Sequence, residues 1–243
     1  MKKRQIFLIC LLLTFFVGSV GAKDNVLKLR VENMTCGGCS GKINKTVSAI
    51  DGVSGFEANL EARIVTIAYD DQKTNSDKLK ESIQAVKYNA QDYDPNEVIT
   101  RTVSFKATQI GCGGCVAKVK KNIGAEAGVL SVDGDATTKE VKVQYDANKV
   151  SAKEIKQDFQ KFSYTVTRYW ASEKINYTIL KLEELSSVED VEKTLAATKG
   201  IQDFSVNPTT KTIAVAYNNT VFADNALLSA SLTEQNLKFA AAK

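Results

Sequence analysis

Histidine is absent from this 243-residue chain, and proline, methionine and tryptophan number only two, two and one. A chain without histidine cannot build a Ser-His-Asp triad and has no imidazole to offer a metal ion. The sequence also lacks a glycine-rich phosphate loop, and we recognise no other catalytic constellation in it. We therefore expect a protein that is not an enzyme.

A large excess of charge of one sign is also missing. The formal charge is +4, and three basic residues lie at positions 2–4, so the rest of the chain carries about +1. Lysines occur on most of the predicted helices, which favours solvated helix faces over an anion-binding surface. We expect no nucleic-acid partner.

Only one long apolar run is present, at residues 6–17, directly after the basic residues 2–4. It is shorter than the roughly twenty residues that a membrane span needs, and Val20, Gly21 and Ala22 form the small-residue pattern of a cleavage site. We predict a signal peptide over residues 1–22, cleaved after Ala22 and carrying Cys10 away with it. The mature chain should be exported, most simply to a Gram-negative periplasm, and should contain no membrane span.

The other four cysteines form two Cys-Gly-Gly-Cys loops. Cys112 and Cys115 follow Cys36 and Cys39 at the same distance of 76 positions, and many apolar and glycine positions keep that offset. A fixed period of this kind indicates duplicated domains. A weaker third copy fits an offset of 148, which aligns Glu184 with Cys36 and Ser187 with Cys39.

The hydrophobic period changes along each copy in a definite order. In the first copy, alternation or short apolar runs predict strands, and apolar spacings of three and four predict helices with Ser76 capping the second one. The predicted strands are 26–33, 53–59, 64–69 and 90–93, and the helices contain Ile43, Val47 and Ile50, then Leu79, Ile83 and Val86. This βαββαβ order predicts an α+β ferredoxin-like domain, with an antiparallel sheet and both helices on one face. We expect three tandem domains, at 23–95, 99–170 and 174–243, the third degenerate and without cysteines.

The motif Met-Thr-Cys-Gly-Gly-Cys at residues 34–39, before an amphipathic helix, resembles the heavy-metal-associated (HMA) domain found in copper chaperones and the periplasmic mercury-binding protein. The resemblance implies that Cys36 with Cys39, and Cys112 with Cys115, are metal ligands. It also implies that Tyr88, and the tyrosine at position 164, shield the two loops. Met34 matches the apolar residue beneath the family's loop, whereas the second copy has Ile110 there and Gly111 in place of Thr35.

The chemistry of the loops can also be argued from the residues themselves. A helix N-terminus stabilises a thiolate, and we expect the two glycines to allow backbone conformations that let both sulfurs reach one ion. Thiolates select soft ions, so Cu(I) is the first candidate, with Hg(II) and Ag(I) next by resemblance. Structural Zn(II) normally takes four ligands and ranks behind them. An ion held by two sulfurs can accept thiolates from a partner, such as a metal-transporting ATPase or another donor or acceptor protein.

Two alternatives remain open at this stage. A Cys-x-x-Cys pair also occurs in redox proteins, and in an oxidising compartment it can close into a disulfide that blocks metal binding. The chain would then be a thiol-disulfide redox protein or a secreted interaction module. In the third copy, Ser186 and Glu189 predict a capping box, and this domain could dock a transporter or chaperone or simply complete the stack.

Overall fold

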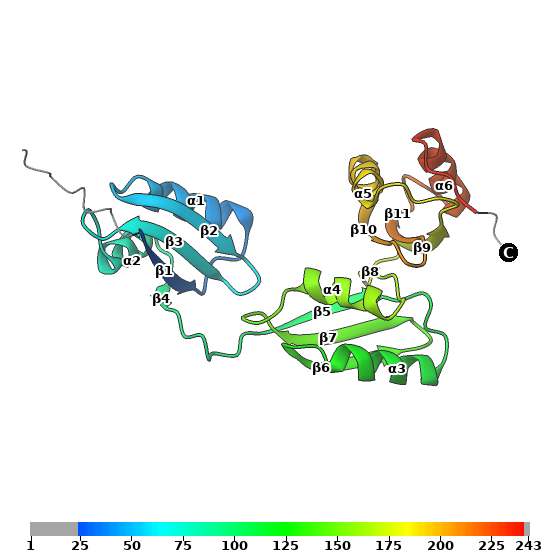
Figure 1. Ribbon diagram of the computed structural model, residues 1–243, viewed down its shortest axis with the longest axis horizontal. Coiled ribbons are helices and arrows are strands. Elements are labelled where there is room, and N and C mark those ends of the chain that lie inside the picture. The colour runs from blue at the N-terminus through cyan, green and yellow to red at the C-terminus, as the bar shows by residue number, and fades with distance from the viewer. Residues whose placement is uncertain (1–23, 241–243) are drawn as a thin grey trace, which may run out of the picture. The chain divides into compact units, whose positions relative to one another are not determined.

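The computed structural model describes residues 24–240, so the predicted signal peptide and Cys10 lie outside the described residues. The chain divides into two compact units between Tyr93 and Asp94 (Figure 1). The second unit holds two of the three sheets. Among the described helices, each is too short or too polar to cross a membrane.

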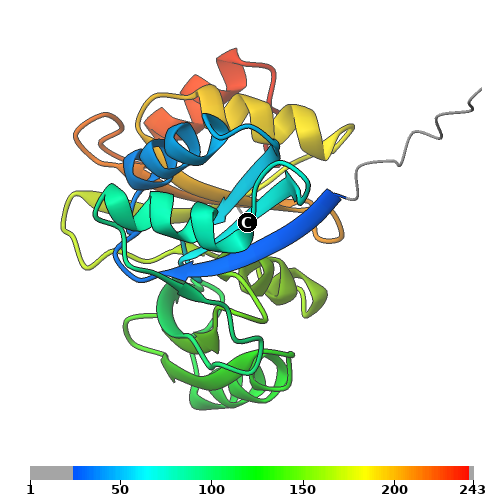
Figure 2. The ribbon, with the colours of Figure 1, turned by 90° about the vertical axis from the view of Figure 1, so that its left-hand side faces the viewer.

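The first unit is a single βαββαβ domain, as predicted. Its sheet is antiparallel in the order β2-β3-β1-β4, and Leu29 of β1 lies opposite Val65 of β3. Its elements are β1 (Asp24–Val31), α1 (Gly37–Ser48), β2 (Val53–Asn59), β3 (Ile64–Asp70), α2 (Ser76–Ala85) and β4 (Ala90–Asp92). One core cluster joins the inner face of the sheet to both helices, which confirms that α1 and α2 cover the same face (Figure 2).

The second domain repeats this plan, with sheet order β6-β7-β5-β8 and Phe105 opposite Val141. Its elements are β5 (Thr100–Lys106), α3 (Gly113–Gly124), β6 (Val129–Asp135), β7 (Glu140–Asp146), α4 (Ala152–Lys161) and β8 (Thr167–Arg168). Ser151 and Glu154 form the predicted capping box at the start of α4. Phe105 and Phe159 join sheet and helix through rings whose centroids are 5.3 Å apart.

The third domain keeps both helices but has a three-stranded sheet in the order β10-β11-β9. Its elements are β9 (Ile175–Lys181), α5 (Val188–Ala197), β10 (Ile201–Asn207), β11 (Thr212–Asn218) and α6 (Asn225–Glu234). Within the described part of the chain, the fourth strand is reduced to a single bridge between Leu182 and Phe239. The loss of this strand agrees with the prediction that the third domain is degenerate.

Two predicted helix caps are wrong by one residue. Asn75, not Ser76, caps α2, because its backbone is extended and its side chain accepts a hydrogen bond from the backbone N–H of Lys78 at 2.9 Å. Likewise Ser187 caps α5, accepting from Asp190 N–H at 3.1 Å, so Ser186 and Glu189 do not form the predicted box. In both helices, the residue that forms the cap is the sequence neighbour of the predicted one and is of an equally suitable type.

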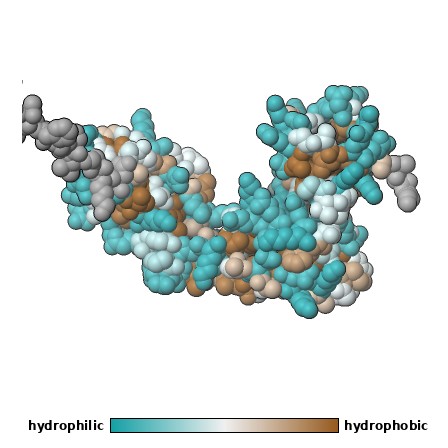
Figure 3. All heavy atoms as spheres, viewed as in Figure 1, coloured by the Kyte–Doolittle hydropathy of each residue, from teal (hydrophilic) through white to brown (hydrophobic). Residues whose placement is uncertain are grey.

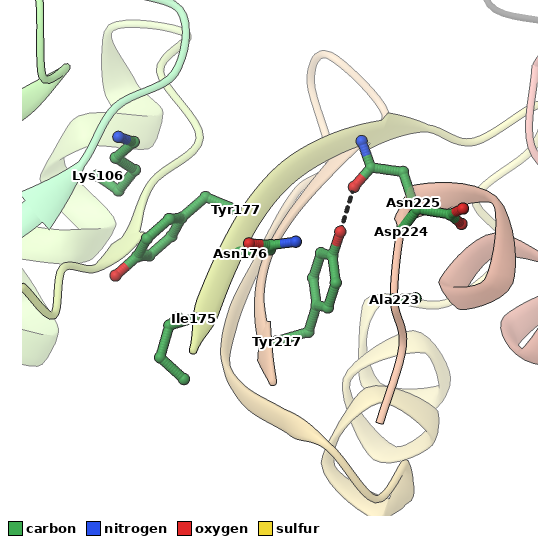
Figure 4. Close-up of a pocket in the computed structure, with 8 residues that line it drawn as sticks. All are labelled: Lys106, Ile175, Asn176, Tyr177, Tyr217, Ala223, Asp224 and Asn225. Carbon is green, nitrogen blue, oxygen red and sulfur yellow. Dashed lines mark hydrogen bonds between the residues drawn. The ribbon is translucent and has the colours of Figure 1, made fainter. Parts of the chain in front are cut away.

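The second and third domains contact one another at the segment that joins them. Tyr169 stacks on Tyr177, and the Nζ atom of Lys106 lies 5.5 and 5.3 Å from their ring centroids. A pocket of about 420 Å³ lies here. It is lined by Lys106, by residues of β9 that include Tyr177, by Tyr217 of β11 and by the start of α6 (Figure 4). Trp170, at the same joint, is 36% exposed, and its neighbour Tyr169 makes the ring contact.

The surface in the view of Figure 3 is mixed, with apolar patches between hydrophilic residues. Exposed large apolar side chains are scattered over several elements; they include Val26 of β1, Leu130 of β6 and Leu227 of α6. Scattered exposed apolar residues are usual on folded proteins and need no ligand to explain them.

Candidate functional site

The first cysteine of each loop is the N-cap of a helix. Cys36 has extended backbone, and its Sγ accepts a hydrogen bond from Cys39 N–H at 3.4 Å; Cys112 does the same for Cys115 at 3.1 Å. The second cysteine of each pair lies in the first helical turn. The position of the second cysteine at the helix start agrees with the prediction, whereas the capping role of the first was not predicted. Both sulfurs therefore lie where unpaired N–H groups favour negative charge.

The glycines between the cysteines do not act as we expected. Their φ angles are not positive, and a Cβ built on Gly37 or Gly113 would meet nothing within 4 Å. A Cβ on Gly38 or Gly114 would instead lie 3.9 or 4.0 Å from the Sγ of the preceding cysteine. The prediction that the backbone needs glycine here is wrong. Without a side chain at Gly38 or Gly114, the Sγ atom of the first cysteine of each pair stays uncovered on that side.

The first pair consists of free thiols whose Sγ atoms are 2.6 Å apart. The hydrogen bond from Cys36 is the largest cause that lowers the pKa of Cys39 to about 7, and hydrogen bonds from the Thr35 backbone and the Tyr88 side chain act in the same direction. Near neutral pH, about half of Cys39 is therefore thiolate, the form that binds metal.

Tyr88 lies against the first loop, as the family resemblance implied. It is half-buried against the core together with Cys39, and Lys42 Nζ lies 5.9 Å from the centroid of its ring. Burial, followed by the hydrogen bond with Cys39, raises the pKa of Tyr88, so its hydroxyl stays protonated and can donate to the sulfur. The tyrosine at the matching position, 164, is also half-buried.

The second pair, Cys112 and Cys115, is joined by a disulfide. Beneath the two loops, Met34 and Ile110 are both completely buried, so each loop has its apolar anchor, as predicted. The two sites thus share scaffold and anchor. They differ in oxidation state and in the Thr35 to Gly111 exchange.

The third domain aligns differently from our expectation. In the sheet Leu180 pairs with Ile213 as Leu29 pairs with Val65, so the offset before the first helix is 151 and not 148. Ser187, which caps α5, therefore takes the place of Cys36, and Asp190 takes the place of Cys39. The offset falls from 151 to 148 because α5 is two residues shorter than α1 and the turn from the helix end to Gly200 is one residue shorter than the turn to Gly52.

Across residues 24–240, no cluster of three or more Cys, His, Asp or Glu side chains is placed to hold a metal ion. Each Cys-Gly-Gly-Cys loop can therefore offer two sulfurs and leaves the other coordination positions of an ion open.

The low pKa of Cys39 leads to a prediction about reactivity. In the reduced, metal-free protein, alkylation of Cys39 by iodoacetamide should rise through a midpoint near pH 7, because only the thiolate reacts. In urea the midpoint should move up towards the ordinary cysteine value of about 8.5. Peptide mass spectrometry after timed quenching would measure both profiles. A folded midpoint equal to that in urea would contradict the stabilising contacts.

Comparison with known proteins places these loops in a family. The heavy-metal-associated domain profile matches residues 28–89 and 104–165, together just over half of the chain. Over 136 residues, the chain is 33% identical to a copper-exporting P-type ATPase of Staphylococcus aureus (strain MRSA252), covering 56% of this chain and 16% of the ATPase. It is 23% identical over 143 residues to the copper-exporting P-type ATPase of Bacillus subtilis (strain 168), covering 59% of this chain and 17% of that protein. The chain thus spans about a sixth of the length of these relatives.

Solved structures of similar chains are smaller. Oxidized MerP from Ralstonia metallidurans CH34 is 28% identical and covers 30% of this chain and 100% of its own, with a TM-score of 0.29. The N-terminal soluble domains of Bacillus subtilis CopA are 21% identical and cover 63% of this chain and 98% of their own, with a TM-score of 0.28.

Proposed function

The chain belongs to the heavy-metal-associated domain family, and from that premise we propose that it binds a soft heavy-metal ion at two dithiol sites and sequesters it or passes it on. The sites are Cys36 with Cys39, and Cys112 with Cys115 once its disulfide is reduced. The chain itself performs no catalysis in this proposal. Its cargo is the ion.

One observation carries the proposal. In the first loop two free thiols lie with their sulfurs 2.6 Å apart at a helix N-terminus, and one has a pKa of about 7. Cys36 is exposed, so a bound ion would remain open to solvent on that side. An ion with two protein sulfurs and open positions can be taken over by a partner's thiolates through stepwise ligand exchange.

Cu(I) is the cargo we propose first. Thiolate ligands select soft ions. In residues 24–240 no third Cys, His, Asp or Glu is placed beside either pair, and two sulfurs alone fit an ion that accepts low coordination. Hg(II) and Ag(I) share that chemistry, whereas Zn(II) usually takes four protein ligands in structural sites. The relatives described above are named as copper exporters, which supports the same order.

A metal-transporting ATPase, or another metal donor or acceptor protein, is the partner that this chemistry fits. We also propose that the chain is exported to the periplasm after cleavage at Ala22, which rests on its N-terminal sequence alone.

Metal selectivity tests the proposal. The reduced chain is mixed with Cu(I) and an excess of Zn(II), and native mass spectrometry identifies the ions retained. We expect Cu(I) on both loops and no Zn(II), because each loop supplies only two sulfurs. A chain with the four cysteines of the two loops changed to serine is the control. Retention of Zn(II) in preference to Cu(I), or Cu(I) bound equally by the control, would refute the proposal.

The disulfide between Cys112 and Cys115 favours a second candidate function. The chain would be a thiol-disulfide redox protein or an interaction module whose second pair stays oxidised. That candidate predicts no metal binding at the second loop even under strong reductants.

A further inference from the structure

A short segment after α4 ties the second domain's last strand to its cysteine loop. The backbone N–H of Thr165 donates to Gln109 Oε1 at 2.9 Å, and Gln109 lies three residues before Cys112. The first domain has the same contact, from Asn89 N–H to Asn33 Oδ1 at 2.9 Å. In both domains, movement of this segment is therefore coupled to the chain that leads into the loop.

The first domain fastens this segment with its own side chains. Lys80 of α2 donates to Asp92 Oδ1 of β4 at 2.8 Å, and their side chains are 27% and 85% accessible, so the carboxylate is largely in solvent. Gln84 donates to the carbonyl oxygen of Ala90 at 3.0 Å. No residue of another domain takes part in these two contacts.

The second domain lacks the matching carboxylate, because Arg168 stands where the first domain has Asp92. Lys156, which matches Lys80, reaches Asp203 of the third domain instead, with both carboxylate oxygens 2.7 Å from Nζ. Asp203 Oδ2 also accepts from the backbone N–H of Arg168 at 2.7 Å. The Lys156 and Asp203 side chains are only 15% and 21% exposed, so this pair is far more enclosed than its counterpart.

Other residues of the third domain hold the same segment. Ser205 Oγ donates to the carbonyl oxygen of Val166 at 2.6 Å, and the hydroxyls of Thr165 and Thr212 lie 2.7 Å apart. Gln160, which matches Gln84, donates to the carbonyl oxygen of Val206 at 3.0 Å. Residues 165–167 are buried as a result, whereas the matching residues 89 and 91 of the first domain are exposed.

We propose that the third domain is a brace for the second cysteine loop and that Asp203 is its main positioning residue. Asp203 replaces the carboxylate lost at Arg168, holds the segment 165–168, and through Gln109 limits how readily the loop opens. In stepwise exchange each cysteine sulfur must leave the ion in turn, and this departure is a local movement of the loop. The brace therefore slows transfer of the ion from the second site only. This role rests on the proposed metal-binding function.

The test uses two chains that each keep one cysteine pair, loaded with Cu(I) and mixed with a chromogenic Cu(I) chelator. In the chain that keeps Cys112 and Cys115, Asp203→Asn should speed Cu(I) transfer about tenfold, because it leaves an enclosed Lys156 without its charge partner. In the chain that keeps Cys36 and Cys39, the same change should leave the rate unaltered. Asp92→Asn, the matched change in the first domain, should have little effect on either chain because Asp92 is largely exposed to solvent.

A rescue variant separates positioning from general damage. Arg168→Asp in the Asp203→Asn background gives Lys156 a carboxylate within its own domain, as in the first domain, and should restore slow transfer. Ser205→Ala removes one hydrogen bond to the segment and should give a smaller acceleration, which keeps the test usable if Asp203→Asn unfolds. An unchanged rate at the second pair, or equal acceleration at both pairs, would overturn the brace.

Hydrogen exchange tests the brace without metal. In the reduced, metal-free chain, Asp203→Asn should increase amide exchange over residues 109–116 and not over residues 33–40. If neither loop binds Cu(I) but this difference is seen, the proposed function fails and the brace stands. Equal exchange over residues 109–116 in the Asp203→Asn chain and in the unchanged chain would refute the brace whether or not metal binds.

Discussion

Changing Cys36 and Cys39 to serine should remove one of two Cu(I) ions from the reduced chain and leave the other in place. Serine keeps the size of the side chain and can still cap α1, but it is a poor ligand for a soft ion. Changing Cys112 and Cys115 should remove the other ion, and the fourfold variant should bind none. Native mass spectrometry in the presence of a competing chelator gives the number of tightly bound ions directly.

The third domain supplies the matched control for this experiment. Asp190 stands at the position of Cys39 and is exposed, so Asp190→Asn should leave two ions bound. Far-UV circular dichroism should be the same for all variants, since the cores beneath the loops are built from buried apolar side chains and not from the ion. Two ions retained after loss of Cys36 and Cys39 would place the ligands elsewhere.

Much of each domain could be predicted because its local signals agree with one another. Apolar spacing in β1, α1, β3 and α2 gave residues that meet in one core, among them Ile43, Val47, Leu79 and Ile83. The duplicated loops and the offset of 76 gave the position of both cysteine pairs on equivalent helices. Period and repeat are local properties of a chain, so they can be read without its tertiary contacts.

The contact between the second and third domains could not be predicted in the same way. A strand pattern shows which face is apolar but not what covers the other face. One signal was present: residues 213–217 of β11 are buried without alternation, and Ala214 and Ala216 leave room on the outer face of the sheet. A continuous apolar run indicates that both faces of a strand are buried. Here it indicates that the outer face of the third domain's sheet is covered as well as the inner face.

Charge pairing across domains was harder still to foresee. Asp203 is one of many acidic residues. Its role becomes visible only when the domains are compared: Arg168 stands at the position of Asp92, so Lys156 lacks the partner that Lys80 has and pairs with Asp203 instead. The two shifted caps show a smaller limit of the same kind. Neighbouring Asn, Ser and Glu residues compete for the cap, and the backbone entering the helix decides among them.

In a glutathione titration of the metal-free chain, the Cys112–Cys115 disulfide should need more strongly reducing conditions than the Cys36 and Cys39 pair. Contacts that stabilise a thiolate stabilise the reduced form of a pair, and so make its disulfide easier to reduce. Cys39 receives such contacts from Cys36, the Thr35 backbone and Tyr88, and its pKa is lowered to about 7. We expect the two midpoints to differ by about 30 mV or more, equivalent to a tenfold difference in equilibrium constant.

This difference would make metal capacity depend on redox conditions. Between the two midpoints the first pair is a dithiol and the second a disulfide, so the chain should bind one Cu(I), and full reduction should raise this to two. Alkylation of free thiols followed by peptide mass spectrometry at each glutathione ratio would assign the midpoints, and Tyr88→Phe should bring them closer by removing one contact to Cys39. Coincident midpoints, or a first pair that is reduced later than the second, would show that these contacts do not set the order, because stabilisation of the Cys39 thiolate can only favour earlier reduction of its pair.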